Sequence, residues 1–221
     1  MKGTLIVFEG TDGSGKATQA HLLAQRLMRE GILFREIDFP RYGNPFAEPA
    51  RLYLEGALGK HPGDVSAYAA STLYAVDRYA SYREDWGGDY EAGTLILADR
   101  YTTSNAVHQA SKLPEAERKE YLQWLFDFEY HRLELPKPDL VFYLDLPAEL
   151  SERMLRQREA ATGTHADIHE QDRDYLRRCR HSARQIARDL CWTVVNCAQD
   201  DKVRSAEEIH QEIWDVVQGF L

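Results

Sequence analysis

The sequence predicts an α/β fold: an open, five-stranded parallel sheet with helices on both faces. Two observations predict this fold. Short apolar runs alternate with longer helical stretches along the chain, and most of these runs are apolar on both faces, as in buried parallel strands. Parallel strands need crossover connections, and helices usually supply them. Ligands of such sheets bind beyond the carboxyl ends of the strands, so polar residues just after each strand are candidate site residues.

The elements follow from this alternation. The expected strands are Thr4–Glu9, Ile32–Phe39, Thr94–Ala98, Leu140–Leu146 and Thr193–Asn196. The expected helices are Lys16–Glu30, Val65–Glu84, Thr102–Lys112, Glu115–Tyr130, Ala148–Arg158, Asp172–Leu190 and Ala206–Gly219. No repeat, linker or change in composition divides the chain, so we expect one domain over residues 1–221.

Composition excludes several classes of protein. The net charge of −9 argues against nucleic acid as the main partner. No apolar run approaches the roughly 18 residues that a membrane span needs, and Met1–Gly10 is too short and too soon acidic for a secretory signal. The three cysteines form no CxxC pair. We therefore expect reduced thiols, a cytoplasmic location and no membrane partner.

The strongest motif is the glycine-rich run from Gly10 to Lys16, which lies between the first strand and the first helix. Its GxxxxGK spacing lets backbone N–H groups surround a phosphate at a helix N-terminus, while Lys16 neutralises the β- and γ-phosphates. Glycine is needed where the backbone turns tightly or approaches the ligand closely. The alternative, a glycine turn that only caps a helix, is disfavoured by the strand–loop–helix context.

The residue after Lys16 departs from the motif. A Ser or Thr hydroxyl usually binds Mg²⁺ there, but this chain has Ala17, and Thr18 is rotated by roughly 100° along the helix. Either the metal is held through water and carboxylates, or the loop is not a working nucleotide site. We favour the first, with Asp99 at a strand end as the metal ligand and Asp12 as a second candidate. Asp99 could instead be a helix cap.

A basic segment stands out in the acidic chain. Residues 151–190 carry nine arginines and seven acidic residues, and Arg158–His169 shows no clear period. We interpret residues 151–172 as a lid, with a mobile loop between two helices. A solvated surface is the simpler alternative, but the phosphate-binding motif favours the lid.

Several motifs together identify a resemblance. They are Phe8–Lys16 with Thr18-Gln19, Asp38-Phe39-Pro40-Arg41-Tyr42, Tyr74 with Arg78, Asp99-Arg100-Tyr101, and the arginine-rich lid. The chain resembles thymidylate kinases, P-loop enzymes that transfer the γ-phosphate of ATP to dTMP. The motifs occur in the family's order from residue 4 to about residue 175. The P-loop alone would indicate only a superfamily, whereas the combination is specific.

The resemblance implies how the acceptor is bound. Arg78 would reach the nucleoside monophosphate while Tyr74 stacks on the thymine ring, and their i,i+4 spacing independently places them on one helix face. Tyr74 could instead be an ordinary core aromatic residue. Arg41 and Arg100 would hold the 5′-phosphate, because a guanidinium binds phosphate oxygens with two hydrogen bonds.

The helix after Asp99-Arg100-Tyr101 would read the nucleoside. Asn105 and Gln109 would hydrogen-bond the edge of the base, unless they are routine polar helix residues. His108 stands where the family usually has Tyr or Phe, whose ring disfavours a 2′-hydroxyl. This departure leaves the selectivity for sugar and base open, although an isolated His is more often only a satisfied polar residue.

The resemblance also implies the donor side and the catalytic groups. ATP would be bound by Gly10, Gly13, Ser14, Gly15, Lys16, Thr18 and Arg153. Some family members carry a catalytic arginine directly after the loop aspartate. This chain has Gly13 there, so the lid must supply the arginine from Arg153, Arg156 or Arg158, and we assign Arg158 to the phosphoryl group. The lid also lacks the family's Asp-Arg pair, because Ile168 follows Asp167.

The expected reaction is transfer of the γ-phosphate of Mg·ATP to dTMP, giving dTDP for DNA synthesis. Lys16, the arginines and Mg²⁺ would screen charge, Asp12 or Asp99 would help to orient the acceptor phosphate, and no dedicated general base is expected. One alternative is a kinase for another deoxynucleoside monophosphate or a nucleoside. Another is a catalytically weak nucleotide-binding P-loop protein. The family and the Ala-rich helix Val65–Glu84 indicate a homodimer, unless the small residues only pack on the sheet.

Overall fold

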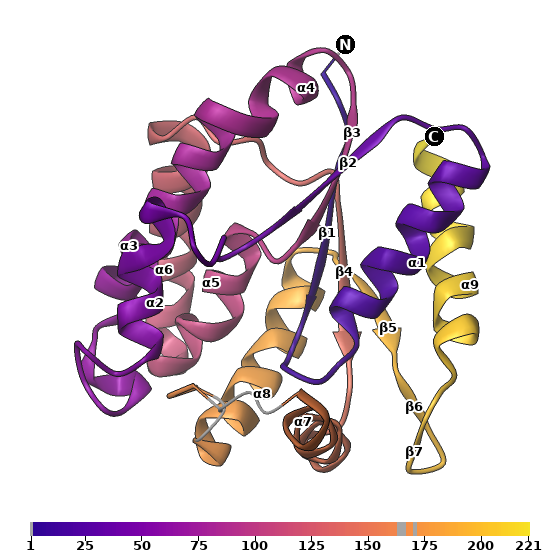
Figure 1. Ribbon diagram of the computed structural model, residues 1–221. Helices are drawn as coiled ribbons and strands as arrows, with labels where there is room; N and C mark the ends of the chain where they lie inside the picture. The colour runs from indigo at the N-terminus through magenta and orange to yellow at the C-terminus, as the bar shows by residue number, and fades with distance from the viewer. Residues whose placement is uncertain (1, 163–166, 170–171) are drawn as a thin grey trace.

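The computed structural model describes residues 2–162, 167–169 and 172–221. Its main sheet is made of β2 (Phe34–Asp38), β3 (Leu95–Asp99), β1 (Leu5–Gly10), β4 (Leu140–Asp145) and β5 (Thr193–Asn196), in that order. All neighbouring pairs of these strands are parallel (Figure 1). The predicted five-stranded parallel sheet is therefore confirmed. A small antiparallel pair, β6 (Ala198–Gln199) and β7 (Lys202–Val203), follows β5.

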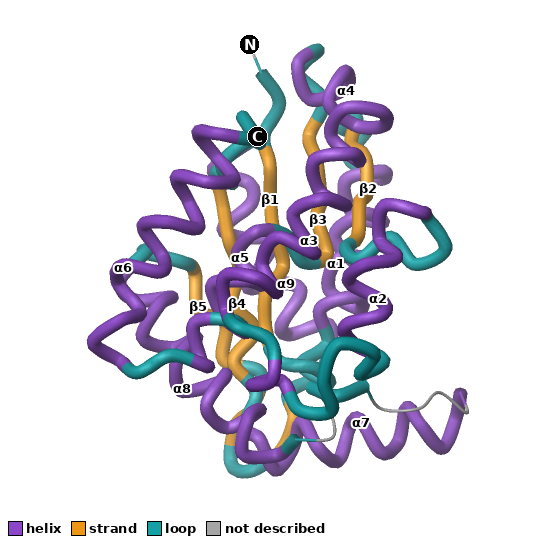
Figure 2. The backbone as a smooth tube through the Cα atoms, turned by 90° about the vertical axis from the view of Figure 1, so that its left-hand side faces the viewer, coloured by secondary structure: helices purple, strands orange, loops and turns teal. Residues whose placement is uncertain are grey.

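Helices cover both faces of the sheet, as the sequence predicts (Figure 1). One face carries α1 (Lys16–Arg29) and α9 (Ala206–Val217). The helices on the other side are α2 (Glu48–Leu54), α3 (Ala67–Ser81), α4 (Gly87–Glu91), α5 (Thr102–His108), α6 (Glu115–Phe126) and α8 (Arg173–Asp189). In Figure 2, α7 (Ala148–Thr162) lies at the carboxyl end of the sheet.

The central strands form the core because their side chains are apolar on both faces. Every residue of β1 and of β4 is buried. Phe8 and Phe142 stack between the sheet and α1, with ring centroids 5.5 Å apart. On the opposite face Leu5, Val7 and Val141 pack in a second cluster. Continuous apolar runs are what a sheet covered on both faces requires.

Several element boundaries differ from the prediction. The expected helix Val65–Glu84 begins at Ala67, because the Ser66 side chain accepts a hydrogen bond from the backbone N–H of Ala69 and caps the helix. It passes into a π turn at Tyr82–Trp86, and α6 passes likewise into a π turn at Asp127–Arg132. In addition to these π turns, the described residues form short 3₁₀ turns at Pro45–Ala47, Pro62–Asp64, Ala110–Lys112 and Gln218–Phe220. The short helices α2 and α4 were not predicted.

The expected start of the lid loop is also wrong. We predicted that the helix ends at Arg158, but α7 continues to Thr162. The reason is local: Glu159, Ala160 and Ala161 are strong helix formers, so the sequence offers nothing to stop the helix. The part of the predicted loop at residues 163–166 lies outside the described residues.

The parallel arrangement brings the motifs to one edge of the sheet. The phosphate-binding loop follows β1, and Asp38 and Asp99 are register partners at the ends of β2 and β3. Arg100 follows directly, with a positive φ of 69° that turns the chain away from the strand. Within the described residues no helix is both long and apolar enough to cross a membrane.

Candidate active site

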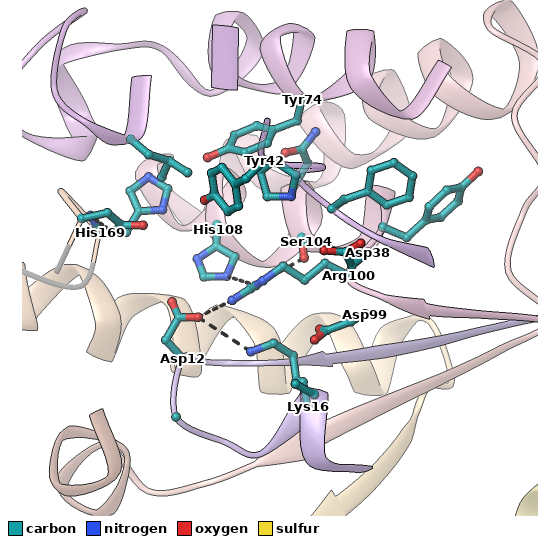
Figure 3. A pocket seen from close by; sticks show the side chains of 18 of the residues that line it. Asp12, Lys16, Asp38, Tyr42, Tyr74, Asp99, Arg100, Ser104, His108 and His169 are labelled. Atoms are coloured by element: carbon teal, nitrogen blue, oxygen red, sulfur yellow. Dashed lines mark hydrogen bonds and ion pairs between the residues drawn. The ribbon is translucent and has the colours of Figure 1, made fainter. Parts of the chain in front are cut away.

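A cavity of about 590 Å³ opens at this edge of the sheet (Figure 3). Its wall combines the phosphate-binding loop, the ends of β2 and β3, the inner faces of α3 and α5, and the segment at residues 167–169. The predicted site residues that line it are Asp12, Gly13, Gly15, Lys16, Thr18, Tyr74, Arg78, Asp99, Arg100, Asn105, His108 and Gln109. Segments that are far apart in sequence thus meet around one space.

The loop after β1 has the shape of a phosphate site. Lys16 folds back over it, and its Nζ donates to the carbonyl oxygens of Gly10, at 3.0 Å, and Thr11, at 3.2 Å. Gly13 and Gly15 have φ values of 77° and 92°, a conformation that favours glycine. A Cβ at Gly13 would lie 2.9 Å from the carbonyl oxygen of Ser151, so α7 packs directly on the loop. This contact explains why the position cannot carry an arginine here.

Charge is balanced at the centre of the cavity by Asp12. Its carboxylate forms an ion pair with Arg100 and lies 3.8 Å from Lys16 Nζ (Figure 3). Burial opposes the charged form, but Arg100 and Lys16 outweigh it and hold the pKa of Asp12 well below its usual range. Burial and the neighbouring Arg100 lower the pKa of Lys16. Arg100 and Lys16 therefore share the single carboxylate of Asp12, and an incoming phosphate could bind both cations.

Two histidines close one side of the cavity. His108 and His169 stack with centroids 5.8 Å apart, and both are buried. Arg100 Nη1 lies 3.3 Å from His108 Nε2. Because a guanidinium only donates, this His108 nitrogen must accept, which places the proton on Nδ1. Burial, followed by the charge of Arg100, lowers the pKa of His108 to about 3.

His169 is fixed from the opposite direction. Tyr53 Oη lies 2.8 Å from His169 Nε2 and accepts a hydrogen bond of 2.8 Å from Lys112 Nζ. The Tyr53 hydroxyl has one proton and also lies 3.5 Å from the carbonyl oxygen of Pro62, so the direction of its hydrogen bond with His169 depends on the histidine tautomer. Burial, followed by the charges of His108 and Lys112, lowers the pKa of His169. The segment at residues 167–169 is thereby attached to α2, where Ile168 N also donates to Leu54 O at 3.2 Å.

The opposite wall is organised around a buried ion pair. Arg78 donates to Glu129 from Nε at 2.7 Å and from Nη2 at 2.5 Å. Asn105 Nδ2 lies 3.3 Å from the same carboxylate. Tyr74 lines the cavity nearby, in edge-to-face contact with Tyr53 at 6.1 Å. Gln109 lines it as well, and its Oε1 is buried without a hydrogen-bond partner in the described part of the chain.

The metal question rests on Asp99. Its Oδ1 is buried without a hydrogen-bond partner among the described residues, so one carboxylate oxygen is free to bind a cation. Those residues contain no group of three or more His, Cys, Asp or Glu side chains placed to hold a metal ion. Mg²⁺ usually binds through one or two carboxylates, waters and substrate phosphates, so this donor set fits Mg²⁺ that arrives with a nucleotide.

Comparison with known proteins decides the family. The profile of the family described as thymidylate kinase matches residues 8–213, almost the whole chain. The chain belongs to the thymidylate kinase family. The interpretation of the sequence as an ATP-dependent kinase that phosphorylates dTMP to dTDP is thereby confirmed.

Individual thymidylate kinases agree with this assignment. The enzyme of Mycobacterium tuberculosis is 35% identical over 179 residues, which cover 79% of this chain and 81% of the relative. The enzyme of Halothermothrix orenii is 32% identical, covering 100% and 99% of the two chains. The solved structure of the Candida albicans enzyme has a TM-score of 0.69 and 21% identity, and it covers 99% of this chain and 92% of its own, which supports the fold.

Not every predicted site residue of this thymidylate kinase reaches the cavity. Arg41 does not line it, although Pro40 and Tyr42 do; its Nε lies 2.8 Å from Asp77 Oδ1 and its Nη1 3.0 Å from Glu84 Oε1. Arg153 lies with Arg156 at a separate surface hollow along α7. Gly10 and Ser14 belong to the loop but do not line the cavity. The side chain of Arg158 lies outside the described part of the structure, so its role stays a prediction.

Sequence reasoning missed several residues of the cavity wall, namely Asp38, Tyr42, Ser104, Met154 and His169. Two of them had a signal. Tyr42 ends the Phe39-Pro40-Arg41-Tyr42 motif, and Asp38 lies near the carboxyl end of a predicted strand, much as Asp99 does. His169 had none, because its contact with His108 joins segments 61 residues apart, and sequence spacing cannot show such a pairing.

The buried histidines predict acid sensitivity. The pKa of His108 is about 3 in the folded protein against an ordinary value of 6.5, so the unfolded chain binds more protons between these values. The contribution of His108 to the unfolding free energy is therefore fully present above about pH 6.5 and is lost as the pH falls towards 3. The groups that face His108 include Arg100, Asp12, Lys16, Lys112, His169, Tyr175 and Cys179.

From pH 7 to pH 5, His108 should contribute about 2 kcal/mol to the loss of unfolding free energy. Urea unfolding followed by tryptophan fluorescence at both pH values measures this loss. The variant His108→Phe should lose correspondingly less over the same interval. Equal losses in the two proteins would contradict the assignment.

Proposed function

We propose that this cavity is where the thymidylate kinase binds both nucleotides and transfers the phosphoryl group. One observation supports the proposal above all. A single cavity joins the P-loop Lys16 to a second cation, Arg100, and continues to a wall formed by Tyr74, Arg78 and Asn105. One nucleotide alone would not need this second group of cations. The arrangement suits two sets of phosphates that meet between Lys16 and Arg100, with the acceptor base at the far wall.

The acceptor phosphate would replace Asp12 as the partner of Arg100. A phosphate dianion offers a guanidinium several acceptor oxygens, and charge-assisted hydrogen bonds are the strong ones. Asp12 would remain beside Lys16, the second cation that lowers its pKa, as an orienting carboxylate. Catalysis would then rest on alignment and charge screening, with no dedicated general base.

The remaining charge at the γ-phosphate would be neutralised from α7. Gly13 carries no side chain and packs against Ser151 of α7, the helix that also carries Arg153 and Arg156. We assign Arg158 to the phosphoryl group and Arg153 to the ATP side. Residues 151–172 would act as a lid that excludes water when ATP is bound.

Mg²⁺ would be held by Asp99, whose free carboxylate oxygen is described above, with Asp12 as the neighbouring carboxylate. The ion supplies charge neutralisation on the phosphates of ATP. Ala17 offers no hydroxyl to the metal, so the carboxylates and water replace the usual ligand.

The enzyme would work in the cytoplasm as a homodimer. The three cysteines, Cys179, Cys191 and Cys197, are free thiols, in keeping with a reducing compartment. On α3, Tyr68, Val76 and Tyr79 are between 37% and 46% exposed. The spacing of these residues places them along one side of the helix, and Phe46 and Leu52 add exposed apolar side chains nearby. Such a face suits contact with its own copy in a second chain.

The test of function is an ADP-release assay with Mg·ATP and a panel of dTMP, dUMP, dCMP, dAMP, dGMP and UMP. We expect a strong preference for dTMP and a requirement for Mg²⁺. Turnover of a different monophosphate would leave the fold and mechanism intact but overturn the assignment of the base wall. ATP binding without phosphorylation of any acceptor would favour a nucleotide-binding protein disabled by Ala17.

Two arginine variants separate the roles of Arg100 and Arg41. Arg100→Ala should raise the KM for dTMP by about ten- to hundredfold, because one or two charge-assisted hydrogen bonds are lost. Arg41→Ala should leave this KM within about threefold. It should instead lower the unfolding free energy by about 3 kcal/mol, because Asp77 stays buried without its cationic partner and keeps, among the described residues, only the backbone N–H of residue 41. Steady-state kinetics measure the KM values and urea unfolding measures the stability, and a large rise in KM for Arg41→Ala would support its predicted phosphate role.

The proposed dimer is tested by Val76→Glu. A carboxylate on the exposed face of α3 should be repelled by its own copy across a symmetric contact and convert dimer to monomer in analytical ultracentrifugation. The matched control is Leu33→Glu, at a residue that is 75% exposed between α1 and β2. The control should sediment as the unchanged protein does. A Val76→Glu protein that remains dimeric would exclude this face.

A further inference from the structure

Glu129 is a buried carboxylate that the predicted mechanism does not use. It is fully buried in the π turn Asp127–Arg132, and it does not line the cavity. It accepts hydrogen bonds from two residues that do line it, Arg78 and Asn105. A fourth hydrogen bond comes from Thr102 Oγ1 at 2.6 Å. One anion thus holds two side chains of the base wall from behind.

The contacts of Asn105 settle which way its amide points. Nδ2 lies 3.3 Å from Glu129 Oε1 and 3.3 Å from the carbonyl oxygen of Ser71. A carboxylate and a carbonyl oxygen only accept hydrogen bonds, so the amide must turn its NH₂ group towards both of them. Both amide hydrogens are then directed away from the cavity, and Oδ1 is the atom left to meet a ligand.

Arg78 is fixed in the same manner. Its Nε and Nη2 are held by the two oxygens of Glu129, which orients the whole planar guanidinium. Nη1 takes no part in these two hydrogen bonds, and Arg78 belongs to the cavity wall. The wall therefore presents a donor from Arg78 beside an acceptor from Asn105.

This polarity matches one kind of base edge. Thymine and uracil carry a carbonyl oxygen next to an N–H group, which is the complement of a donor beside an acceptor. Cytosine carries an amino group next to an unprotonated ring nitrogen, so it would set donor against donor and acceptor against acceptor. Buried polar groups without a hydrogen-bond partner cost binding free energy. A site built to hydrogen-bond thymine would therefore reject cytosine strongly.

We propose that Glu129 is a specificity-determining positioning residue: as an acceptor-only anion it sets the donor–acceptor polarity with which Arg78 and Asn105 distinguish thymine from cytosine. The inference rests on the proposed function, in which this wall receives the acceptor base. It adds that the selectivity is controlled by a residue that never touches the base.

A neutral amide at the same position would remove that control. The side chain of Glu129→Gln still accepts from Arg78, but it also donates. Each carboxylate oxygen of Glu129 accepts from Arg78, so the NH₂ group of the glutamine would face an Arg78 donor, and one of the two hydrogen bonds that orient the guanidinium would be lost. Arg78 could then turn its donor away from the thymine carbonyl oxygen, while the Ser71 carbonyl oxygen still holds Asn105. Glu129→Asp keeps an acceptor-only anion. It should therefore keep the Arg78 donor beside the Asn105 acceptor, although its shorter side chain places the carboxylate farther from both.

The experiment measures kcat and KM for dTMP and for dCMP in the intact enzyme and in three variants. The ratio of the two kcat/KM values reports the discrimination. We expect Glu129→Gln to lower this ratio at least tenfold, chiefly through a higher KM for dTMP with kcat within about threefold, since the reacting phosphates lie at the other end of the cavity. Glu129→Asp should keep the ratio within about threefold of the original.

Thr102→Val is the matched control. It removes one hydrogen bond to the same carboxylate without altering Arg78 or Asn105, so it should leave the ratio unchanged. Thermal unfolding of each variant verifies that it is folded. If Glu129→Gln does not fold, Glu129→Asp still decides, because a tenfold loss of discrimination in it would overturn the role of acceptor polarity.

Two other results would also overturn the proposal. One is an equal loss of kcat/KM for both acceptors in Glu129→Gln, which a merely structural role predicts. The other is a loss of discrimination in Thr102→Val as large as that in Glu129→Gln. Failure of the proposed function is seen separately, because the unaltered enzyme would then show no preference for dTMP over dCMP.

Discussion

Buried positive charge is the constraint on which the rest of this site depends. Lys16, Arg78 and Arg100 all line one cavity, and an unpaired ion in such a place costs several kcal/mol. Each cation therefore has an anion near it. Glu129 forms the permanent partner of Arg78, at 2.5 Å, whereas Asp12 serves Arg100 and Lys16 together. The Glu129–Arg78 pair orients the base wall. Asp12 occupies the position beside Arg100 and Lys16 that a phosphate can take.

The two ends of the cavity differ in rigidity, because Glu129 and Asp12 are held differently. Glu129 receives four hydrogen bonds and is fully buried, so the residues that it orients are firmly held. Asp12 is 16% exposed and belongs to a glycine-rich loop. A preorganised wall at one end and an exchangeable anion at the other fit a reaction in which the base must be recognised while phosphate charge arrives and leaves.

Much of this arrangement could be predicted from the sequence, for identifiable reasons. Most of the strands were predicted because they are short runs apolar on both faces, and Gly10–Lys16, Arg78 and Asn105 were predicted as site residues because motif spacing is local. The contacts that the sequence did not predict join residues far apart along the chain. Glu129 lies 51 residues from Arg78 along the chain, and the link between Tyr53 and His169 spans 116. Arg41 is a different case: its motif is local, but the hydrogen bonds of its guanidinium with Asp77 and Glu84 join residues 36 and 43 positions apart, and its phosphate role stays a prediction.

The π turn at Asp127–Arg132 has a consequence for how this chain can vary in length. A π turn holds one residue more than a regular helical turn, and that extra residue sets the direction in which Glu129 points. Removing Asp127 or Phe128 would take a residue out ahead of Glu129 and rotate its side chain by roughly 100° about the axis of α6. The carboxylate would then leave Arg78 buried without its anion. A change of length ahead of Glu129 would therefore disturb the base wall, although Asp127 itself lies on the protein surface.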